Sequence, residues 1–181
     1  HRSLMDYVFG LLEEIPLSQS GSFALASSIA TDLGNTVLFG SLFTGGLLHI
    51  LDKNLISNAA GMHAYFEKNS IDCLKIVPSH WNALVWDSKP LLPRKLLIFG
   101  GESLRKEMLE PIRNWGKSCV IINHYGPTET TVGKLFHRVD LEQNYQGIVP
   151  IGNPFSNAKA YILSQQLALC PVGVPGELYL S

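Results

Sequence analysis

The sequence predicts an α/β fold, a mostly parallel sheet flanked by helices, followed by a smaller β-rich C-terminal portion. Up to about residue 134, short apolar runs alternate with segments of helical periodicity, which is typical of a parallel sheet with right-handed crossovers. Beyond Gly133 the apolar runs follow one another with turns between them and without a long helical pattern. We therefore expect an α/β subdomain over 1–134 and a β-rich segment over 135–181.

In the first half of the chain, the spacing of apolar residues predicts the helices and strands, and a glycine pair marks the end of one helix. A short apolar run at 23–26 precedes a buried helix at 34–43, which a glycine pair at 45–46 ends. The run 47–51 is a strand candidate. Apolar side chains at helical spacing predict a half-buried helix over 58–68.

In the second half, Pro78 stops a predicted strand at 74–77, and Ser79 is expected to cap a helix that runs to about residue 85. A strand at 95–99 ends in a glycine pair, after which a helix is expected over 102–115 with one apolar face. The remaining predicted strands lie at 120–122, 135–139, 158–163 and 177–180.

Composition limits the classes of function. The 14 basic and 15 acidic residues give a formal charge of −1, which provides no general attraction to nucleic acid. The three cysteines form no C-x-x-C pair, so neither a disulfide framework nor a zinc site is predicted, and a reducing, cytoplasmic location fits best. No apolar run reaches the roughly 18 residues of a membrane span. Charged residues make up 16% of the chain, which is low for a globular domain, so either much of the surface is apolar or the chain is a block cut from a larger protein.

Residues with chemical function concentrate in loops after predicted strands, where ligands bind in open parallel sheets. The loop 123–131 contains several hydroxyls, the Tyr125 ring and the Glu129 carboxylate. An aromatic ring can stack on a base, and a carboxylate supplies the hard oxygen that Mg²⁺ prefers. The glycines Gly100 and Gly101 let a flat ligand approach the backbone. The alternative interpretation is an ordinary polar turn after a buried strand.

The run Asn123-His124-Tyr125-Gly126-Pro127-Thr128-Glu129-Thr130-Thr131 resembles the N-x-Y-G-P-T-E-x-T signature of adenylate-forming enzymes, and more narrowly that of an adenylation domain of a nonribosomal peptide synthetase. Residues 100–104 are similar to the family's G-G-E-x-L motif, and 150–154 and 171–179 resemble two further family segments. Residues 1–8 resemble the H-x-x-L segment after the family's phosphate loop. The resemblance covers essentially the whole chain in the expected order.

The resemblance implies the central part of an adenylate-forming N-terminal domain. The family's phosphate loop would lie just before His1, and its ribose-binding motif would follow Ser181. The C-terminal domain, with the lysine that contacts the carboxylate and the α-phosphate, would lie further on. We therefore expect the parent protein to be an ATP-dependent ligase and the isolated fragment to be inactive.

The implied reaction joins a carboxylic acid to the α-phosphate of ATP, which gives an acyl-adenylate and pyrophosphate. The acyl group then passes to the phosphopantetheine thiol of a carrier protein. ATP and Mg²⁺ are the implied cofactors, and the carrier protein and neighbouring synthetase domains are the implied partners, with no nucleic acid and no membrane. The implied catalytic residues are Thr128 and Glu129, of which Glu129 also holds the metal. The implied nucleotide-binding residues are Gly101, Glu102, Ser103, Asn123, Tyr125 and Thr128.

The family motifs also place the substrate-binding positions, which would be Asp32, Leu33, Thr36, Lys75, Ile98, Gly100, His124, Gly126, Val132 and Gly133. Asp32 stands where amino-acid-activating members keep a carboxylate for the substrate's α-ammonium. An unpaired lysine in an apolar pocket is costly, so Lys75 is expected to bind an anion, with His124 as a second potential cation. The hypothesis is therefore L-aspartate, with asparagine or a β-substituted aspartate next.

Simpler interpretations stay open for three of these residues. Lys75 could extend to water, as most lysines do, His124 could only cap a turn, and Asp32 could be the N-cap of the helix near Leu33. For the whole chain, the alternative is a non-catalytic, adenylation-like structural or interaction subdomain of a megasynthase. A fatty acyl or aryl acid ligase is disfavoured, because its substrate has no ammonium for Asp32.

Overall fold

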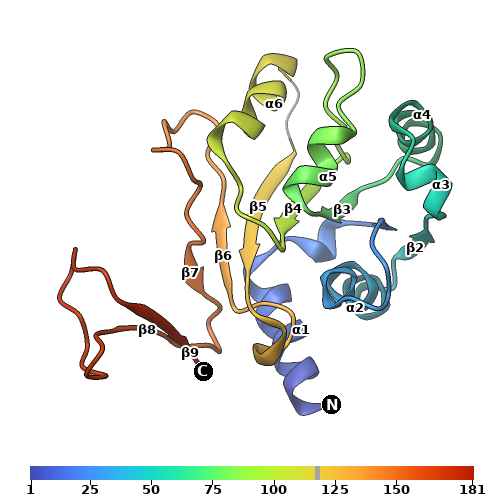
Figure 1. Cartoon of the computed structure of the whole chain (residues 1–181). Helices are drawn as coiled ribbons and strands as arrows, with labels where there is room; N and C mark the ends of the chain where they lie inside the picture. Colours follow the sequence, from blue (N-terminus) through green and yellow to red (C-terminus); the bar gives the residue numbers. More distant parts are fainter. Residues whose placement is uncertain (117–118) are drawn as a thin grey trace.

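A large central sheet with helices on both faces organises the chain (Figure 1). The computed structural model describes residues 1–116 and 119–181. Its α-helices are α1 (Arg2–Glu14), α2 (Asn35–Thr44), α3 (Lys53–Ile56), α4 (Ala59–Asn69), α5 (Pro78–Ala83) and α6 (Glu110–Trp115). Its strands are β1 (Ser22–Leu25), β2 (Leu47–Ile50), β3 (Cys73–Ile76), β4 (Leu96–Gly100), β5 (Val120–Tyr125), β6 (Leu135–Arg138), β7 (Asn153–Pro154), β8 (Ala160–Leu163) and β9 (Glu177–Leu180).

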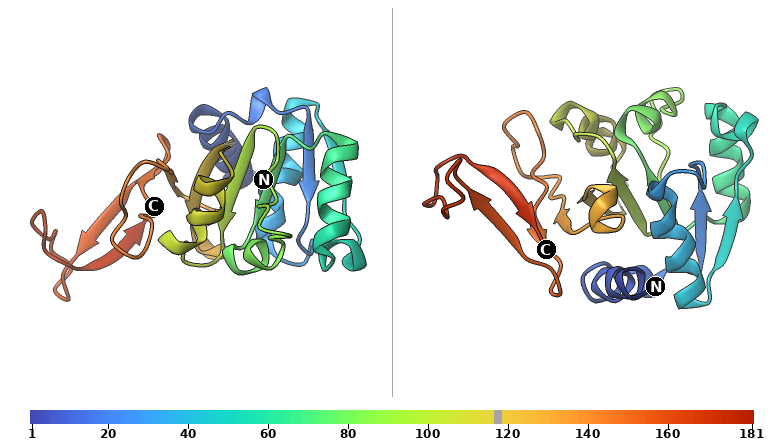
Figure 2. Two further views of the ribbon diagram at one scale, coloured as in Figure 1. Left: turned by 90° about the horizontal axis from the view of Figure 1, so that it is seen from above. Right: turned by 60° about the horizontal axis from the view of Figure 1, so that its bottom comes forward.

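The strands of this described part form two sheets. The large sheet has seven strands in the order β2-β1-β3-β4-β5-β6-β7, in which β1 to β5 are mutually parallel and β6 and β7 pair antiparallel. β8 and β9 form a separate antiparallel pair that extends away from the large sheet (Figure 2). The predicted fold class, a mostly parallel sheet with a smaller β-rich portion after it, is confirmed.

Helices cover both faces of the parallel strands. α1 and α2 lie on one face, and α4, α5 and α6 lie on the other (Figure 2). Strands buried on both faces are apolar along their length, which explains the continuous apolar run of β4 and of β3 apart from Lys75. The register places Lys75, Ile98 and Ile122 side by side in one row on the α1–α2 face. A single lysine therefore stands in an apolar row at the centre of the sheet.

The helix predicted over 102–115 is wrong in its first half. The structure has a 3₁₀ turn at Lys106–Leu109 followed by α6. Upstream of the turn, the carbonyl of Leu104 accepts from the backbone N–H of Val149 at 2.9 Å, and the N–H of Lys106 donates to the carbonyl of Gly147 at 2.8 Å. The distant segment 147–149 thus takes the backbone groups that an α-helix would have used.

Two further differences concern helix starts. Ser79 does not cap α5, since the helix begins at Pro78 and Ser79 donates from its backbone N–H and its hydroxyl to the carboxylate of Glu102, at 3.0 and 2.8 Å. Helix α1 has no counterpart among the predicted elements. Its buried face is formed by Tyr7, Val8 and Leu11, whose spacing is that of an amphipathic helix.

The boundary predicted at residue 134 stays a prediction. β6 begins at Leu135 and pairs with β5 in the large sheet, so the β-rich segment contributes its first strands to the same sheet as the α/β part. Among the helices of the described residues, none has the length and apolar character needed to cross a membrane.

Trp81 allows a test of the packing between α5 and the sheet. Its side chain is fully buried, packs edge-on against Phe99 and donates from Nε1 to the carbonyl of Leu91 at 2.7 Å. Trp81→Phe leaves that carbonyl without its donor and opens a void, so we expect the free energy of unfolding to fall by about 2 kcal/mol in urea titrations. Trp86→Phe is the matched control, because Trp86 is 52% exposed, and it should change stability by less than about 0.5 kcal/mol. Equal effects would contradict this account of the core.

Candidate functional site

Two adjacent cavities open at the carboxyl ends of the central parallel strands. The first, here called the Lys75 cavity, measures about 340 Å³ and is lined by Thr31, Asp32, Leu33, Lys75, Val77, Gly101, His124, Gly126 and Val132. The second, the Tyr125 cavity, measures about 300 Å³ and is lined by Gly101, Glu102, Ser103, Asn123, His124, Tyr125, Gly126, Ile148, Val149 and Ile151. Gly101, His124 and Gly126 line both, so the two cavities share a wall.

Lys75 reaches the first cavity from the middle of β3. It is 2% exposed, and its Nζ donates to Thr36 Oγ1 at 2.6 Å and lies 3.1 Å from His124 Nδ1. Burial lowers the pKa of Lys75 to about 7, although the Asp32 carboxylate opposes that shift. The lysine does not extend to water, so the simpler interpretation of this residue is wrong.

His124 stands beside Lys75 near the end of β5. It is 3% exposed and belongs to the strand, so a role limited to capping a turn does not fit. Burial, and then the neighbouring Lys75, lower the pKa of His124 well below its ordinary value, so the ring is neutral at pH 7. An ammonium on Lys75 can only donate to Nδ1, and the proton of a neutral ring then lies on Nε2.

Asp32 lies across the cavity in a short 3₁₀ turn, Asp32–Gly34. It is not an N-cap, since the cap residue of this turn is Thr31 and that of α2 is Gly34. Within the described residues, Asp32 Oδ2 and His124 Nε2 are both buried and have no hydrogen-bond partner. Buried polar atoms are usually paired, and the residues that carry these two atoms both line the Lys75 cavity.

Four predicted substrate positions lie behind the cavity wall instead of in it. Thr36 is fully buried on α2 and contacts Lys75 Nζ, and Ile98 lies next to Lys75 in the sheet. A Cβ on Gly100 would come within 3.2 Å of Lys75 Cε, and a Cβ on Gly133 would overlap the His124 ring. These positions therefore shape the site by supporting or making room for Lys75 and His124.

The backbone before Gly133 is strained. Thr131 and Val132 have φ values of 70° and 66°, in the left-handed region that β-branched residues avoid. Val132 is 8% exposed and lines the Lys75 cavity. Strain of this kind persists where the surrounding structure imposes it, and it clusters at functional sites. Here the left-handed conformation of these two residues places Val132 in the wall of the Lys75 cavity and Gly133 directly against the His124 ring.

The Tyr125 cavity collects most of the predicted nucleotide-binding residues. Tyr125 is 40% exposed, so its ring face is accessible. Asn123 is buried, and its side-chain nitrogen donates to the carbonyls of Val149 and Pro150 at 3.2 and 2.9 Å, which leaves the amide oxygen as the group facing a ligand. Ile148, Val149 and Ile151 also line this cavity. Sequence reasoning did not include these three among the site residues, although Ile151 lies within the Pro-Ile-Gly-Asn-Pro segment and Ile148 and Val149 directly precede it.

Thr128 and Glu129 lie apart from both linings. They form an exposed 3₁₀ turn, Thr128–Thr130, directly after the strand that carries His124. Within the described residues no group of three or more His, Cys, Asp or Glu side chains is placed to hold a metal ion by itself. Magnesium is commonly bound by one or two carboxylates together with the phosphates of a nucleotide, and a single exposed Glu129 is compatible with that pattern.

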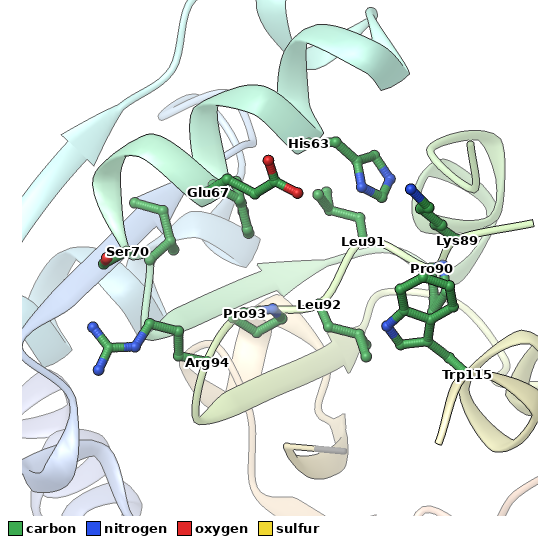
Figure 3. Close-up of a pocket in the computed structure, with 12 residues that line it drawn as sticks. His63, Glu67, Ser70, Lys89, Pro90, Leu91, Leu92, Pro93, Arg94 and Trp115 are labelled. Carbon is green, nitrogen blue, oxygen red and sulfur yellow. The ribbon is translucent and has the colours of Figure 1, made fainter. Parts of the chain in front are cut away.

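A larger cavity of about 530 Å³ lies elsewhere, where α4, the end of α6 and the segment 89–94 meet (Figure 3). Its labelled residues include His63 and Glu67 on α4 and Trp115 at the end of α6. Two of its polar groups already have contacts, since His63 Nε2 bonds to the carbonyl of Leu84 and Lys89 Nζ lies 5.9 Å from the centre of the Trp115 ring. Among the described residues, no unpartnered buried polar atom belongs to this lining. We therefore place the candidate site at the two smaller cavities.

Comparison with known proteins identifies the family. A family model described as AMP-binding enzyme matches residues 1–181, so the chain belongs to the AMP-binding enzymes. It is 35% identical over 188 residues to bacitracin synthase 3 of Bacillus licheniformis, covering 100% of this chain and 3% of that protein. It is 36% identical over 192 residues to surfactin synthase subunit 1 of Bacillus subtilis (strain 168), covering 100% and 5%. The chain thus spans only a small part of these relatives.

The solved structures agree with this family. The chain is similar to a four-domain nonribosomal peptide synthetase whose structure was determined with AMP and glycine bound, with a TM-score of 0.84 and 26% identity, covering 98% of this chain and 13% of that one. The fold is that of an adenylation domain of a nonribosomal peptide synthetase, which confirms the resemblance found in the motifs.

Gly133 provides a test of how closely the loop packs on His124. An added methyl group in Gly133→Ala would overlap the imidazole, so we expect a loss of about 1–3 kcal/mol of unfolding free energy in urea titrations. Gly40→Ala in α2 is the control, because its Cβ would make ordinary van der Waals contacts with the Leu17 methyl groups at 3.6 Å and the Phe23 ring at 3.7 Å. Alanine is also the better helix former, so that variant should be neutral or more stable by up to about 1 kcal/mol. A Gly133→Ala protein as stable as the wild type would contradict the packing described.

Lys75 gives the stability a dependence on pH. Its pKa is about 7 in the folded chain against an ordinary value of 10.5, so between these values the unfolded chain binds a proton that the folded chain has released. The free energy of unfolding therefore rises with pH in this window. We expect the wild type to gain stability relative to Lys75→Met between about pH 7 and pH 10, by on the order of 1 kcal/mol per pH unit. A difference that stays constant across this range in urea titrations would contradict the lowered pKa.

Proposed function

We propose that the chain is the part of an amino-acid-activating adenylation domain that selects the substrate, and that the substrate is L-aspartate. The parent protein would form aspartyl-AMP from ATP and aspartate and pass the aspartyl group to a carrier-protein thiol. The observation that carries the proposal is the Lys75 cavity, where Asp32 Oδ2 and His124 Nε2 are both buried without a partner in the described part of the chain.

The charges of the cavity match the α-ammonium and the side-chain carboxylate of an acidic amino acid. Asp32 offers a carboxylate to an α-ammonium. On the other side, the Lys75 ammonium has three N–H groups, of which one goes to Thr36 and one to His124, so a third is available to the cavity. A side-chain carboxylate there would accept from Lys75 and from His124 Nε2. The α-ammonium and the side-chain carboxylate of aspartate then each have a partner of opposite charge, which offsets the cost of desolvating them.

The tautomer of His124 favours a carboxylate over an amide. With Nδ1 facing the Lys75 ammonium, Nε2 is a donor and needs an acceptor. Both oxygens of a carboxylate are acceptors, whereas the NH₂ group of asparagine would place a donor against a donor. A site that leaves a buried polar group unpaired rejects the wrong ligand strongly. Asparagine and a β-substituted aspartate are the next candidates.

The Tyr125 cavity is where we place the adenine. The Tyr125 ring would stack on the base, with Gly101, Glu102 and Ser103 at its other side, and the Asn123 amide oxygen would accept from the exocyclic amine. The carboxylate of Glu102 is fixed by Ser79, which holds this edge of the cavity in place. Because both cavities share a wall, the substrate carboxylate and the nucleotide would meet beside Gly101 and Gly126.

Charge on the transferring phosphate requires stabilisation as the bond to the carboxylate forms. Thr128 would donate a hydrogen bond to a phosphate oxygen, and Glu129 would hold Mg²⁺. The ion neutralises negative charge on the phosphates when it is bound. The carrier protein with its phosphopantetheine arm and the adjacent synthetase domains are the proposed partners, in keeping with the multidomain relatives.

The experiment is amino-acid-dependent exchange of pyrophosphate into ATP by the full-length protein. We expect aspartate to support the fastest exchange, with asparagine slower by at least about tenfold because a buried donor stays unpaired. Faster exchange with asparagine would overturn the substrate, and no exchange with any amino acid would overturn the activity.

His124→Glu provides a test within the pocket. A carboxylate at this position accepts hydrogen bonds, so it would pair with the NH₂ group of asparagine and repel the side chain of aspartate. We expect the kcat/KM ratio of aspartate to asparagine to fall by tenfold or more in the exchange assay. His124→Gln is the control, because its amide can present either a donor or an acceptor and should reduce discrimination less. An unchanged ratio in His124→Glu would remove His124 from the specificity site.

A further inference from the structure

A chain of buried hydroxyl and amine groups connects α1 to the Lys75 cavity. Tyr7 Oη lies 2.6 Å from Thr36 Oγ1, and Thr36 Oγ1 accepts from Lys75 Nζ, also at 2.6 Å. Lys75 Nζ in turn lies 3.1 Å from His124 Nδ1. All four side chains are 3% exposed or less. Tyr7 is absent from the described lining of the cavity, so it can reach a ligand only through the other members.

Thr36 needs a partner to keep its hydroxyl directed at Lys75. It lies in the first turn of α2, and a threonine hydroxyl in a helix has a competing acceptor in a carbonyl of the preceding turn. If Thr36 turned away, the ammonium would lose one of its two hydrogen bonds inside an apolar environment. Tyr7 Oη gives the hydroxyl a fixed alternative on the side of Lys75.

The ring of Tyr7 is itself held in place. It packs edge-on against Phe155 with centroids 6.3 Å apart, and it lies 6.0 Å from the His124 ring at 55°. Phe155 also contacts His124, at 5.7 Å between centroids. Burial raises the pKa of the Tyr7 phenol well above its ordinary value, so the group keeps its proton at neutral pH. The two ends of the hydrogen-bonded chain thus share one aromatic cluster.

We propose that Tyr7 is a positioning residue for substrate selection, which holds Thr36 so that the Lys75 ammonium keeps one N–H directed at an acidic substrate side chain. This inference rests on the proposed function, since it explains how the selective lysine is held in place. It adds to the specificity positions a residue from α1, a helix that contributes no residue to the described linings of either cavity.

The test is Tyr7→Phe in the full-length protein, assayed by pyrophosphate exchange. The variant keeps the ring packing and removes only the hydroxyl. We expect KM for aspartate to rise about tenfold with kcat within about twofold, and the preference for aspartate over asparagine to fall by a similar factor. Tyr145→Phe is the matched control, because Tyr145 is 3% exposed and its hydroxyl accepts from the backbone N–H of Asp140 at 2.9 Å, away from both cavities. That variant should leave both parameters unchanged.

A double-mutant cycle with Thr36 separates positioning from general damage. Thr36→Val should raise KM for aspartate about as much as Tyr7→Phe, and the double variant should be no worse than Thr36→Val alone, because Tyr7 acts through Thr36. Thr36→Ser keeps the hydroxyl and should retain the aspartate preference. These Thr36 variants test the chain of contacts even where Tyr7→Phe does not fold.

The outcomes distinguish this inference from the proposed function. A wild-type protein that does not prefer aspartate overturns the proposed function. An aspartate preference that Tyr7→Phe leaves intact, or effects of Tyr7→Phe and Thr36→Val that simply add, overturn the positioning role alone.

Discussion

A buried ammonium group is the constraint on which the candidate site depends. Lys75 extends from the central strand of an apolar face, where a charge is expensive unless it is paired and hydrogen-bonded. Thr36 and His124 each occupy one of its N–H groups, and Gly100 leaves room for its stem. Burial lowers the pKa of Lys75 to about 7, so without a bound anion this amine is close to losing its proton at neutral pH. An anionic ligand would stabilise the ammonium.

The parallel sheet is what allows these groups to meet. Lys75, His124 and Gly101 come from three segments separated by more than twenty residues, yet each lies in or just after a parallel strand and reaches the same cavity. The α1–α2 side supplies the buried supports, and the opposite side supplies Asn123 and the segment it anchors. Successive side chains of β5 point to opposite faces of the sheet, so Asn123 and His124 lie on opposite sides of it. The same edge of the sheet therefore contributes residues to both cavities.

Sequence patterns predicted the fold class, and the family motifs located both cavities. The helices α2 and α4 lie where the sequence predicted them, because a glycine pair ends the apolar run of α2 and apolar side chains at helical spacing mark α4. Periodicity failed over 102–106, because those backbone groups pair with 147–149, and no local pattern encodes a partner forty residues away. For the same reason the motifs placed Thr36 and Ile98 at the substrate, whereas the structure places them behind Lys75. The role of Tyr7 was not predicted from the sequence. Apolar spacing can indicate that a tyrosine is buried, but it does not show which group the hydroxyl contacts.

The wall that the two cavities share has a thermodynamic consequence. His124, Gly101 and Gly126 face both spaces, so any movement of this wall that improves the fit of one ligand changes the fit of the other. Such coupling is reciprocal. If one bound ligand changes the affinity for the second by some factor, the second changes the affinity for the first by the same factor. Attempts to retarget the pocket by replacing His124 would thus alter the response to nucleotide as well. Under the proposed function, recognition of the side chain and of the base would be one linked equilibrium.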